Sequence, residues 1–198
     1  MPRLQPLDLA DCPEEARHAL ELAQERLGFV PNSLRILARK PKILEAFSNM
    51  AHAAWAPGSV EPYLKGLVAH ITSRSAGCVY CSAHTTGMAI GRGSEVEKIE
   101  HVWEYETSEL FSDAERAALR VAQLAALNPN GVSDEDFAEL RNHWTDEQVV
   151  EILAIISLFG FLNRWNDTLA TPLEDGPKDL GEKHLSGWGW EVGKHAAE

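Results

Sequence analysis

Two cysteines and one histidine are spaced three residues apart in a single short segment. Cys78 and Cys81 are separated by two residues, and His84 follows Cys81 by three. Residues three apart on a helix lie on adjacent turns of one face, so the spacing predicts two thiols and an imidazole close together. Such a pair can reduce a hydroperoxide, because one thiolate takes the distal oxygen as a sulfenic acid and the other thiol condenses with it.

The spacing also suggests an order of action for the two thiols. We assign Cys81 as the attacking sulfur, because His84 is nearest to it and an imidazole one turn away can accept the thiol proton. Cys78 is then the resolving thiol. The opposite assignment is also physically sound, because Cys78 is nearer the expected start of the helix, where the helix dipole stabilises a thiolate most strongly.

Other polar and aromatic side chains are candidates for supporting roles. His70, on the preceding helix, is a candidate for proton transfer. Arg74 is placed either to stabilise a thiolate or to pair with a surface acid. A long apolar run near residue 160 ends in polar and aromatic residues, and a tyrosine lies between the cysteines. These side chains are candidates for lining the mouth of a substrate pocket. These pocket candidates are Tyr80, Asn163, Trp165 and Asn166, together with Arg74.

A Cys-x-x-Cys-x-x-His segment also fits a zinc site, and His70 would complete a set of four ligands. We favour redox chemistry, because structural zinc normally joins ligands from two separated elements and here three lie on one short segment. We therefore expect no metal and no cofactor. A zinc-binding structural or interaction module remains the alternative.

The elements that must hold these residues are almost all predicted to be helical. Capping residues at Ser112, Ser133 and Thr145 predict helix starts, and Ser59 is expected to cap a helix that reaches residue 76. Gly77 is expected to end that helix in the left-handed conformation, so the cysteines begin the next one. The run 149–159 is apolar nearly all round, which predicts a buried central helix.

The chain is expected to form one compact domain of the all-α class. Residues 1–58 are predicted to be helices that pack on a core formed by residues 59–170. Residues 171–198, rich in glycine, proline and charge, are predicted to be an irregular tail. Its residues Trp188 and Trp190 are expected to be anchored on this chain or on a neighbouring subunit.

The charge and hydropathy of the chain exclude several classes of partner. The 30 Asp and Glu residues exceed the 18 Lys and Arg residues, which gives a formal charge of −12. Nucleic acid is not expected as a partner, because phosphate binding requires a basic face. No apolar run of about 18 residues and no apolar leader is found, so we expect no membrane association and a cytoplasmic location.

Residues 60–168 resemble the AhpD-like alkylhydroperoxidase family of the carboxymuconolactone decarboxylase superfamily. The resemblance rests on the Cys-x-Tyr-Cys-x-Ala-His-Thr element, the stretch from Phe111 to Ala118 and the stretch from Thr145 to Glu151. It implies an all-helical bundle that forms homo-oligomers and reduces small hydroperoxides with electrons from a dithiol donor. A lyase like the decarboxylases of the superfamily, which would not require the thiols, is a further alternative.

Two positions depart from the pattern of that family. Members typically carry a glutamate twelve residues before the first cysteine, where this chain has Gly66. Their histidine commonly stands four residues after the second cysteine, whereas His84 stands three after Cys81. The resemblance therefore implies a variant subgroup without the usual relay glutamate, in which His70 is expected to take over part of the proton relay.

Overall fold

The computed structural model describes residues 2–197, and within that range the chain is helical with no strand. The all-α fold predicted from the sequence is therefore confirmed. The helices are α1 (Glu14–Leu27), α2 (Asn32–Leu37), α3 (Pro41–Trp55), α4 (Pro62–Ser75), α5 (Val79–Gly91), α6 (Val96–Glu100), α7 (Asp113–Ala125), α8 (Asp134–His143), α9 (Asp146–Leu169) and α10 (Asp175–Leu185).

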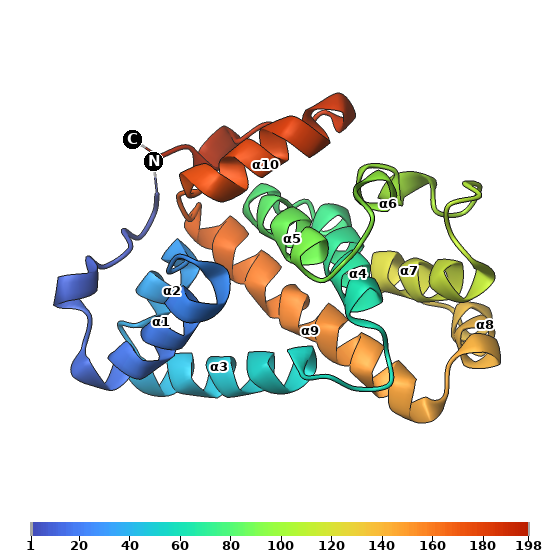
Figure 1. The fold of residues 1–198 in the computed structure, drawn as a ribbon, viewed down its shortest axis with the longest axis horizontal. Coiled ribbons are helices and arrows are strands. Elements are labelled where there is room, and N and C mark those ends of the chain that lie inside the picture. The colour runs from blue at the N-terminus through green and yellow to red at the C-terminus, as the bar shows by residue number, and fades with distance from the viewer. Residues whose placement is uncertain (1, 198) are drawn as a thin grey trace.

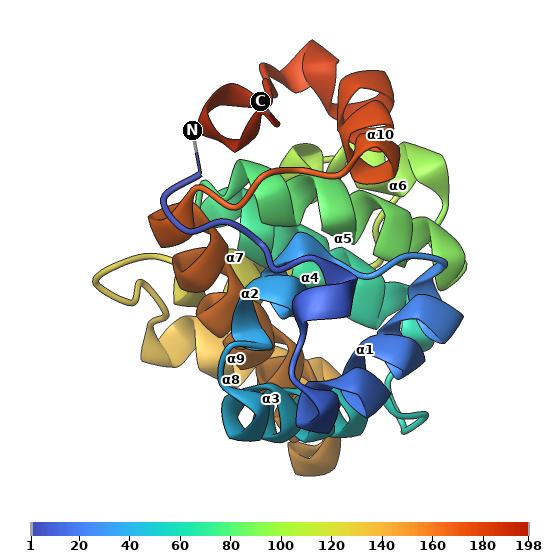
Figure 2. The same ribbon diagram turned by 90° about the vertical axis from the view of Figure 1, so that its left-hand side faces the viewer.

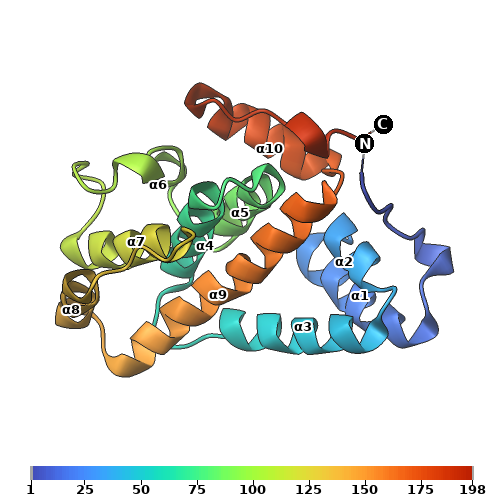
Figure 3. The same ribbon diagram turned by 180° about the vertical axis from the view of Figure 1, so that it is seen from behind.

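Helix α9 crosses the middle of the molecule, and the other helices are arranged around it (Figure 1). Helices α4 and α5 form a closely packed pair against α9, and α3 lies along another side of it. Seen from behind, α7 and α8 lie at one end of the molecule, and α1 and α2 lie at the other (Figure 3). Helix α10 covers α5, while the N-terminal segment runs beside the end of α9 (Figure 2).

Helix α9 is apolar because it forms the centre of this bundle. A capping box at Thr145 begins it as predicted, and its buried positions include Val149, Ile152, Ile155, Leu158 and Phe159. By length and composition it is the one helix of the described range that could cross a membrane. Only 39% of its most apolar window is buried within the chain, so the expectation of a buried central helix is only partly met.

Most predicted helix boundaries agree with the structure, but that of α4 does not. The capping serines of α7 and α8, Ser112 and Ser133, accept hydrogen bonds as expected. Ser59 does not cap α4, which begins at Pro62 with Glu61 at the N-cap. Proline suits the first helical position because its φ is preset and its missing N–H is not needed there, so the helix starts later than Ser59 predicted.

The prediction of an irregular tail was wrong for its first part, because residues Asp175–Leu185 form α10. Pro177 lies in the first turn of α10, where a backbone N–H would make no hydrogen bond within the helix, so a proline costs none there. Packing then decides the conformation: a Cβ at Gly181 would lie 2.6 Å from the ring of Trp190, so the glycine leaves room for this indole. Trp190 is thus anchored on its own chain, while Trp188 is 40% exposed.

A buried ion pair joins α4 to α9 at the end of the bundle. Lys65 is 3% exposed, and its Nζ lies 2.7 Å from Oε2 of Glu151. Glu151 also accepts from Ser59 N and Oγ, each at 2.7 Å. Burial alone would raise the pKa of Glu151, but the bonds from Lys65 and Ser59 outweigh it and lower that pKa to about 2.

Replacement of this carboxylate is expected to destabilise the fold. Glu151→Gln leaves the Lys65 ammonium buried without its counter-charge, which we expect to lower the free energy of unfolding by roughly 2–4 kcal/mol in urea denaturation at neutral pH. The control is Glu147→Gln, an exposed carboxylate in the first turn of the same helix. Equal stability of the two variants would contradict this role of the ion pair.

The same pair fixes the direction of a pH effect. A carboxyl group whose pKa is lowered on folding stabilises the native state above its unfolded pKa and loses that contribution as the pH falls. The contribution of Glu151 is therefore complete above pH 4.5 and is lost as the pH falls from 4.5 towards 2. The stability of Glu151→Gln, measured over this range, should show a correspondingly weaker dependence on pH.

Candidate active site

The two cysteines of the motif lie where α4 ends and α5 begins. Gly77 adopts φ +71°, which turns the chain between the two helices. Cys78 is the N-cap of α5, and its Sγ accepts a hydrogen bond from the backbone N–H of Cys81 at 3.3 Å. Both thiols are free. The N–H group and the helix dipole at this position stabilise a negative charge on the sulfur of Cys78.

Both thiols are shielded from solvent, since Cys78 is 1% and Cys81 2% exposed. Burial raises the pKa of Cys81 well above its usual range, and the neighbouring Cys78 adds to the effect. Asn166 acts in the opposite direction, because its Nδ2 donates to Cys81 Sγ at 3.5 Å. At neutral pH Cys81 is accordingly a protonated thiol.

The hydrogen-bond partner of His84 is a carboxylate that sequence reasoning missed. His84 Nε2 lies 2.7 Å from Oε2 of Glu174, which directly precedes α10. The imidazole also stacks on Tyr80, with ring centroids 4.3 Å apart. The spacing had placed His84 beside Cys81, whereas the structure pairs it with Glu174 on the face of α5 that carries Tyr80.

Glu174 is held by two further donors and is part of a buried network. Tyr80 Oη donates to its Oε1 at 2.9 Å, and the backbone N–H of Asn32 donates to the same oxygen at 2.5 Å. Burial raises the pKa of Glu174, but His84 and the N–H of Asn32 outweigh this and lower it. We call Asn32, Tyr80, His84 and Glu174 the carboxylate network. It keeps a negative charge beside the imidazole.

Close packing explains why position 66 carries no carboxylate. A Cβ at Gly66 would lie 2.8 Å from Cα of Ala89 on α5, so no larger side chain fits between the two helices. In this chain the carboxylate beside the imidazole comes instead from Glu174, 90 residues from His84 in the sequence. No local pattern marks such a partner, because only the packing of α10 on α5 brings it into place.

His70 is placed between α4 and α5 rather than at the sulfurs. It is fully buried, and its Nδ1 lies 3.0 Å from Thr85 Oγ1, which lies 2.8 Å from the carbonyl oxygen of Cys81. Burial, and then the charge of Arg74, lowers the pKa of His70 to about 3. His70 is therefore a neutral imidazole at physiological pH and a weak proton acceptor.

The remaining candidates are divided among four surroundings. Burial lowers the pKa of Arg74 to about 10, and its guanidinium lies over the ring of Trp103 at 5.2 Å. Asn163 and Trp165 line a cavity beside α9. Tyr80 belongs to the carboxylate network, and Asn166 contacts Cys81. The predicted pocket residues thus do not form one group, although two of them share a cavity.

Residues 186–197, here called the C-terminal segment, cover the start of α5. Trp190 Nε1 donates to the carbonyl of Val79 at 3.2 Å and to Ser82 Oγ at 3.1 Å. Trp190 and Val192 pack on the apolar cluster that contains both cysteines. The segment is fastened to the rest of the chain because the N–H of Leu173 donates to the carbonyl of His195 at 2.8 Å.

Among residues 2–197, no group of three or more His, Cys, Asp and Glu side chains is arranged to hold a metal ion. His84, which a zinc site would need beside the two sulfurs, has its Nε2 engaged by Glu174.

The carboxymuconolactone decarboxylase family matches residues 41–124 of the chain. The uncharacterized protein YnjA of Escherichia coli is 28% identical over 115 residues, which are 58% of this chain and 63% of YnjA. The match therefore spans less than two thirds of the length of that relative.

Solved structures match over much more of the chain. The apo debrominase Bmp8 has 31% sequence identity and a TM-score of 0.84, with 90% of this chain and 96% of that chain covered. A cysteine-to-alanine variant of Bmp8 is known in complex with 2,3,4-tribromopyrrole. A peroxidase-related protein with an AhpD core from Ralstonia eutropha has 26% identity and a TM-score of 0.78, with 89% of this chain and 94% of that chain covered.

The cover formed by Trp190 is expected to limit access to the dithiol. Trp190→Ala removes the indole from the thiol cluster, so we expect iodoacetamide to modify Cys78 and Cys81 roughly tenfold faster, as followed by peptide mass spectrometry. Trp188→Ala, in the same segment but exposed, is the matched control, and Cys12 is an internal control because it belongs to another cluster. Unchanged rates in Trp190→Ala would show that the segment does not protect the thiols.

Proposed function

Because this chain belongs to the carboxymuconolactone decarboxylase family and has the AhpD-like fold, we propose that it is a thiol-dependent oxidoreductase that reduces hydroperoxides through Cys78 and Cys81. The observation that carries the proposal is the pair of free thiols at the start of α5, with the N–H of Cys81 donating to the sulfur of Cys78. The relatives that are named for an activity are peroxidase-related proteins and a debrominase, so they too are enzymes.

The proposed cycle transfers two electrons from the dithiol to the hydroperoxide. One thiolate attacks the distal oxygen of a hydroperoxide, the O–O bond breaks, and a sulfenic acid and an alkoxide form. The alkoxide takes up a proton and leaves as the alcohol. The second thiol then condenses with the sulfenic acid, releasing water and forming a Cys78–Cys81 disulfide, and a dithiol donor supplies the two electrons that reduce it.

The contacts of the two sulfurs favour Cys78 as the attacking thiolate. Its sulfur accepts the backbone N–H at the positive end of α5, whereas burial raises the pKa of Cys81. Cys81 then acts as the resolving thiol. This order reverses the one that the position of His84 in the sequence had suggested.

We propose that His84 and Glu174 handle the proton of the cycle. The imidazole is partly exposed, with 12% of its side chain accessible, and its Nε2 lies 2.7 Å from the Glu174 carboxylate. Glu174 would thus take the proton-relay role that the usual pattern of the family gives to a glutamate at the position of Gly66. His70 is not given this role, because its low pKa and its contact with Thr85 leave it a neutral packing residue.

Reductive removal of bromine from an aromatic ring is a second candidate function. It is favoured by the likeness to Bmp8 over 90% of this chain. A dithiol can supply the two electrons: one sulfur takes the bromine as a sulfenyl bromide, the ring carbon takes a proton, and the second thiol displaces bromide to form a disulfide. The same two cysteines would serve both reactions, so measurements of peroxide consumption and bromide release distinguish them.

The zinc module and the lyase are not favoured by any observation at the site. The zinc module would be supported if protein purified without chelator contained one zinc ion per chain that thiol reagents release. The lyase would be supported if a double variant, with Cys78→Ser and Cys81→Ser, kept its activity on a lactone. The dithiol donor, the homo-oligomer and the cytoplasmic location remain predictions from the sequence.

Separate replacement of the three cysteines tests the proposed roles. Cys78→Ser and Cys81→Ser are each expected to lower turnover of cumene hydroperoxide with dithiothreitol by at least about 100-fold, while Cys12→Ser retains it. In Cys81→Ser the sulfenic acid on Cys78 has no resolving thiol, so dimedone should trap it there. A dimedone adduct found only on Cys81 of Cys78→Ser would reverse the roles, and full turnover in both variants would refute the dithiol mechanism.

The charge of Glu174 is expected to matter for turnover more than for folding. Glu174→Gln keeps a side chain of the same shape but removes the negative charge beside His84, so we expect kcat to fall roughly 10–100-fold. The control is Glu182→Gln, an exposed carboxylate on α10. Circular dichroism checks that both variants are folded, and a folded Glu174→Gln with the parent pH profile and kcat would contradict this role.

A further inference from the structure

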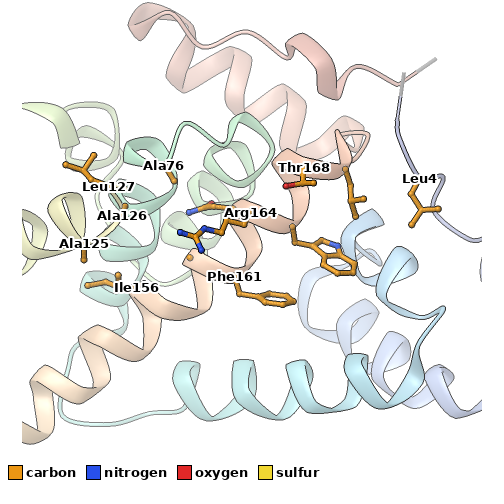
Figure 4. A pocket seen from close by; sticks show the side chains of 13 residues that line it. Leu4, Ala76, Ala125, Ala126, Leu127, Ile156, Phe161, Arg164 and Thr168 are labelled. Carbon is orange, nitrogen blue, oxygen red and sulfur yellow. The ribbon is translucent and has the colours of Figure 1, made fainter. Parts of the chain in front are cut away.

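A cavity of about 680 Å³ lies beside the second half of α9 (Figure 4). Its walls are mainly aliphatic and aromatic, and they come from the N-terminal segment, from α9, from the end of α4 and from the end of α7 with the turn after it. They include Leu4, Leu127, Ile156, Phe161 and Leu169. Its volume falls within the range of roughly 300–1,000 Å³ that small-molecule sites occupy.

Two buried polar atoms at this cavity lack a partner within the chain. Asn163, which is 3% exposed, lines the cavity, and its Nδ2 donates to the carbonyl of Thr72 at 3.4 Å. Its Oδ1 accepts no hydrogen bond, and Nε1 of the lining residue Trp165 donates none. An unsatisfied buried polar group is unfavourable, and a ligand that supplies the missing donor or acceptor relieves it.

Neither sulfur lines the cavity, but neighbouring residues connect it to the dithiol. Asn166 follows Asn163 by three residues on α9, and its amide contacts Cys81 Sγ at 3.5 Å. On the other wall, Ala76 stands two residues before Cys78. The C-terminal segment that covers the thiols contributes no residue to the cavity. A molecule bound there would therefore lie on a side of the dithiol that this segment does not cover.

We infer that this cavity is the substrate site and that it takes a small apolar ring compound with one hydrogen-bond donor, such as an aromatic hydroperoxide. The inference rests on the proposed function and narrows its substrate class. Hydrogen peroxide has no apolar surface to bury, so it gains nothing from such walls. The ring lies against Ile156 and Phe161, Asn163 Oδ1 accepts from the donor, and the reacting end faces Cys78 and Cys81.

Filling the cavity tests the inference at a position that tolerates a larger side chain. Ala76 is exposed and adopts an ordinary helical backbone conformation, so Ala76→Trp is expected to fold. Ala138→Trp, on the exposed face of α8 and outside the cavity, is the matched control. Phe161→Ala, which removes an apolar wall at a residue 41% exposed, is a second variant that does not depend on the first.

The kinetic readout compares two oxidants of different size. For Ala76→Trp we expect the ratio of kcat/KM for cumene hydroperoxide to kcat/KM for hydrogen peroxide to fall at least about tenfold, because only the first oxidant fills the cavity. Phe161→Ala should raise KM for cumene hydroperoxide more than it lowers kcat. An equal change for both oxidants in the two variants, or no change for either, would overturn the inference.

A binding readout separates this inference from the proposed function. The unreactive alcohol 2-phenylpropan-2-ol carries the same ring and one O–H donor, and its titration is followed by NMR through the indole N–H signal of Trp165, assigned with Trp165→Phe. Saturable binding that Ala76→Trp weakens and Ala138→Trp does not supports the site even if no peroxide is reduced. Binding that both variants retain would overturn it.

The cavity would also be misassigned if it were a contact between two copies of the chain. In that case Ala76→Trp would change the mass measured by light scattering, and 2-phenylpropan-2-ol would not bind to the unaltered protein. This outcome would overturn the inference whatever the peroxidase activity. An unchanged mass together with saturable binding supports it.

Discussion

The structure of the site depends on one hydrogen bond at the start of a helix. Gly77 turns the chain out of α4, and the backbone N–H of Cys81 in the first turn of α5 then donates to the sulfur of Cys78. This contact brings the two sulfurs within one helical turn and gives them different surroundings. The close packing of α4 on α5, which leaves no room for a side chain at Gly66, keeps that turn in place.

Burial of the dithiol gives the rest of the fold its role at the site. Trp190 packs over the sulfurs from the C-terminal segment, and Asn166 touches Cys81 from α9. A buried thiol is protected from unspecific oxidation, but it needs a stabilising donor and a path for its substrate. The N–H of Cys81 supplies the donor to Cys78. We propose that the cavity beside Asn163 and Ala76 provides the approach for the substrate.

The helices were predictable from the sequence because their signals are local. The caps at Ser112 and Thr145, and the glycine before the cysteines, each act within one turn, and the structure confirms them. Glu174 carries no such signal, since its partner His84 is 90 residues away and only the docking of α10 joins them. Composition also misjudged residues 175–185, because the stability of α10 comes from packing against α5 and Trp190 rather than from helix propensity.

Whether Cys78 and Cys81 form one redox pair can be read from the mass of the intact chain. After one equivalent of cumene hydroperoxide, we expect a chain lighter by about 2 Da, with a single Cys78–Cys81 bridge in the peptide map and Cys12 still reduced. Dithiothreitol should restore the original mass. A chain that keeps its mass, or that gains oxygen on Cys12 or on methionine instead, would show that the two cysteines do not form such a pair.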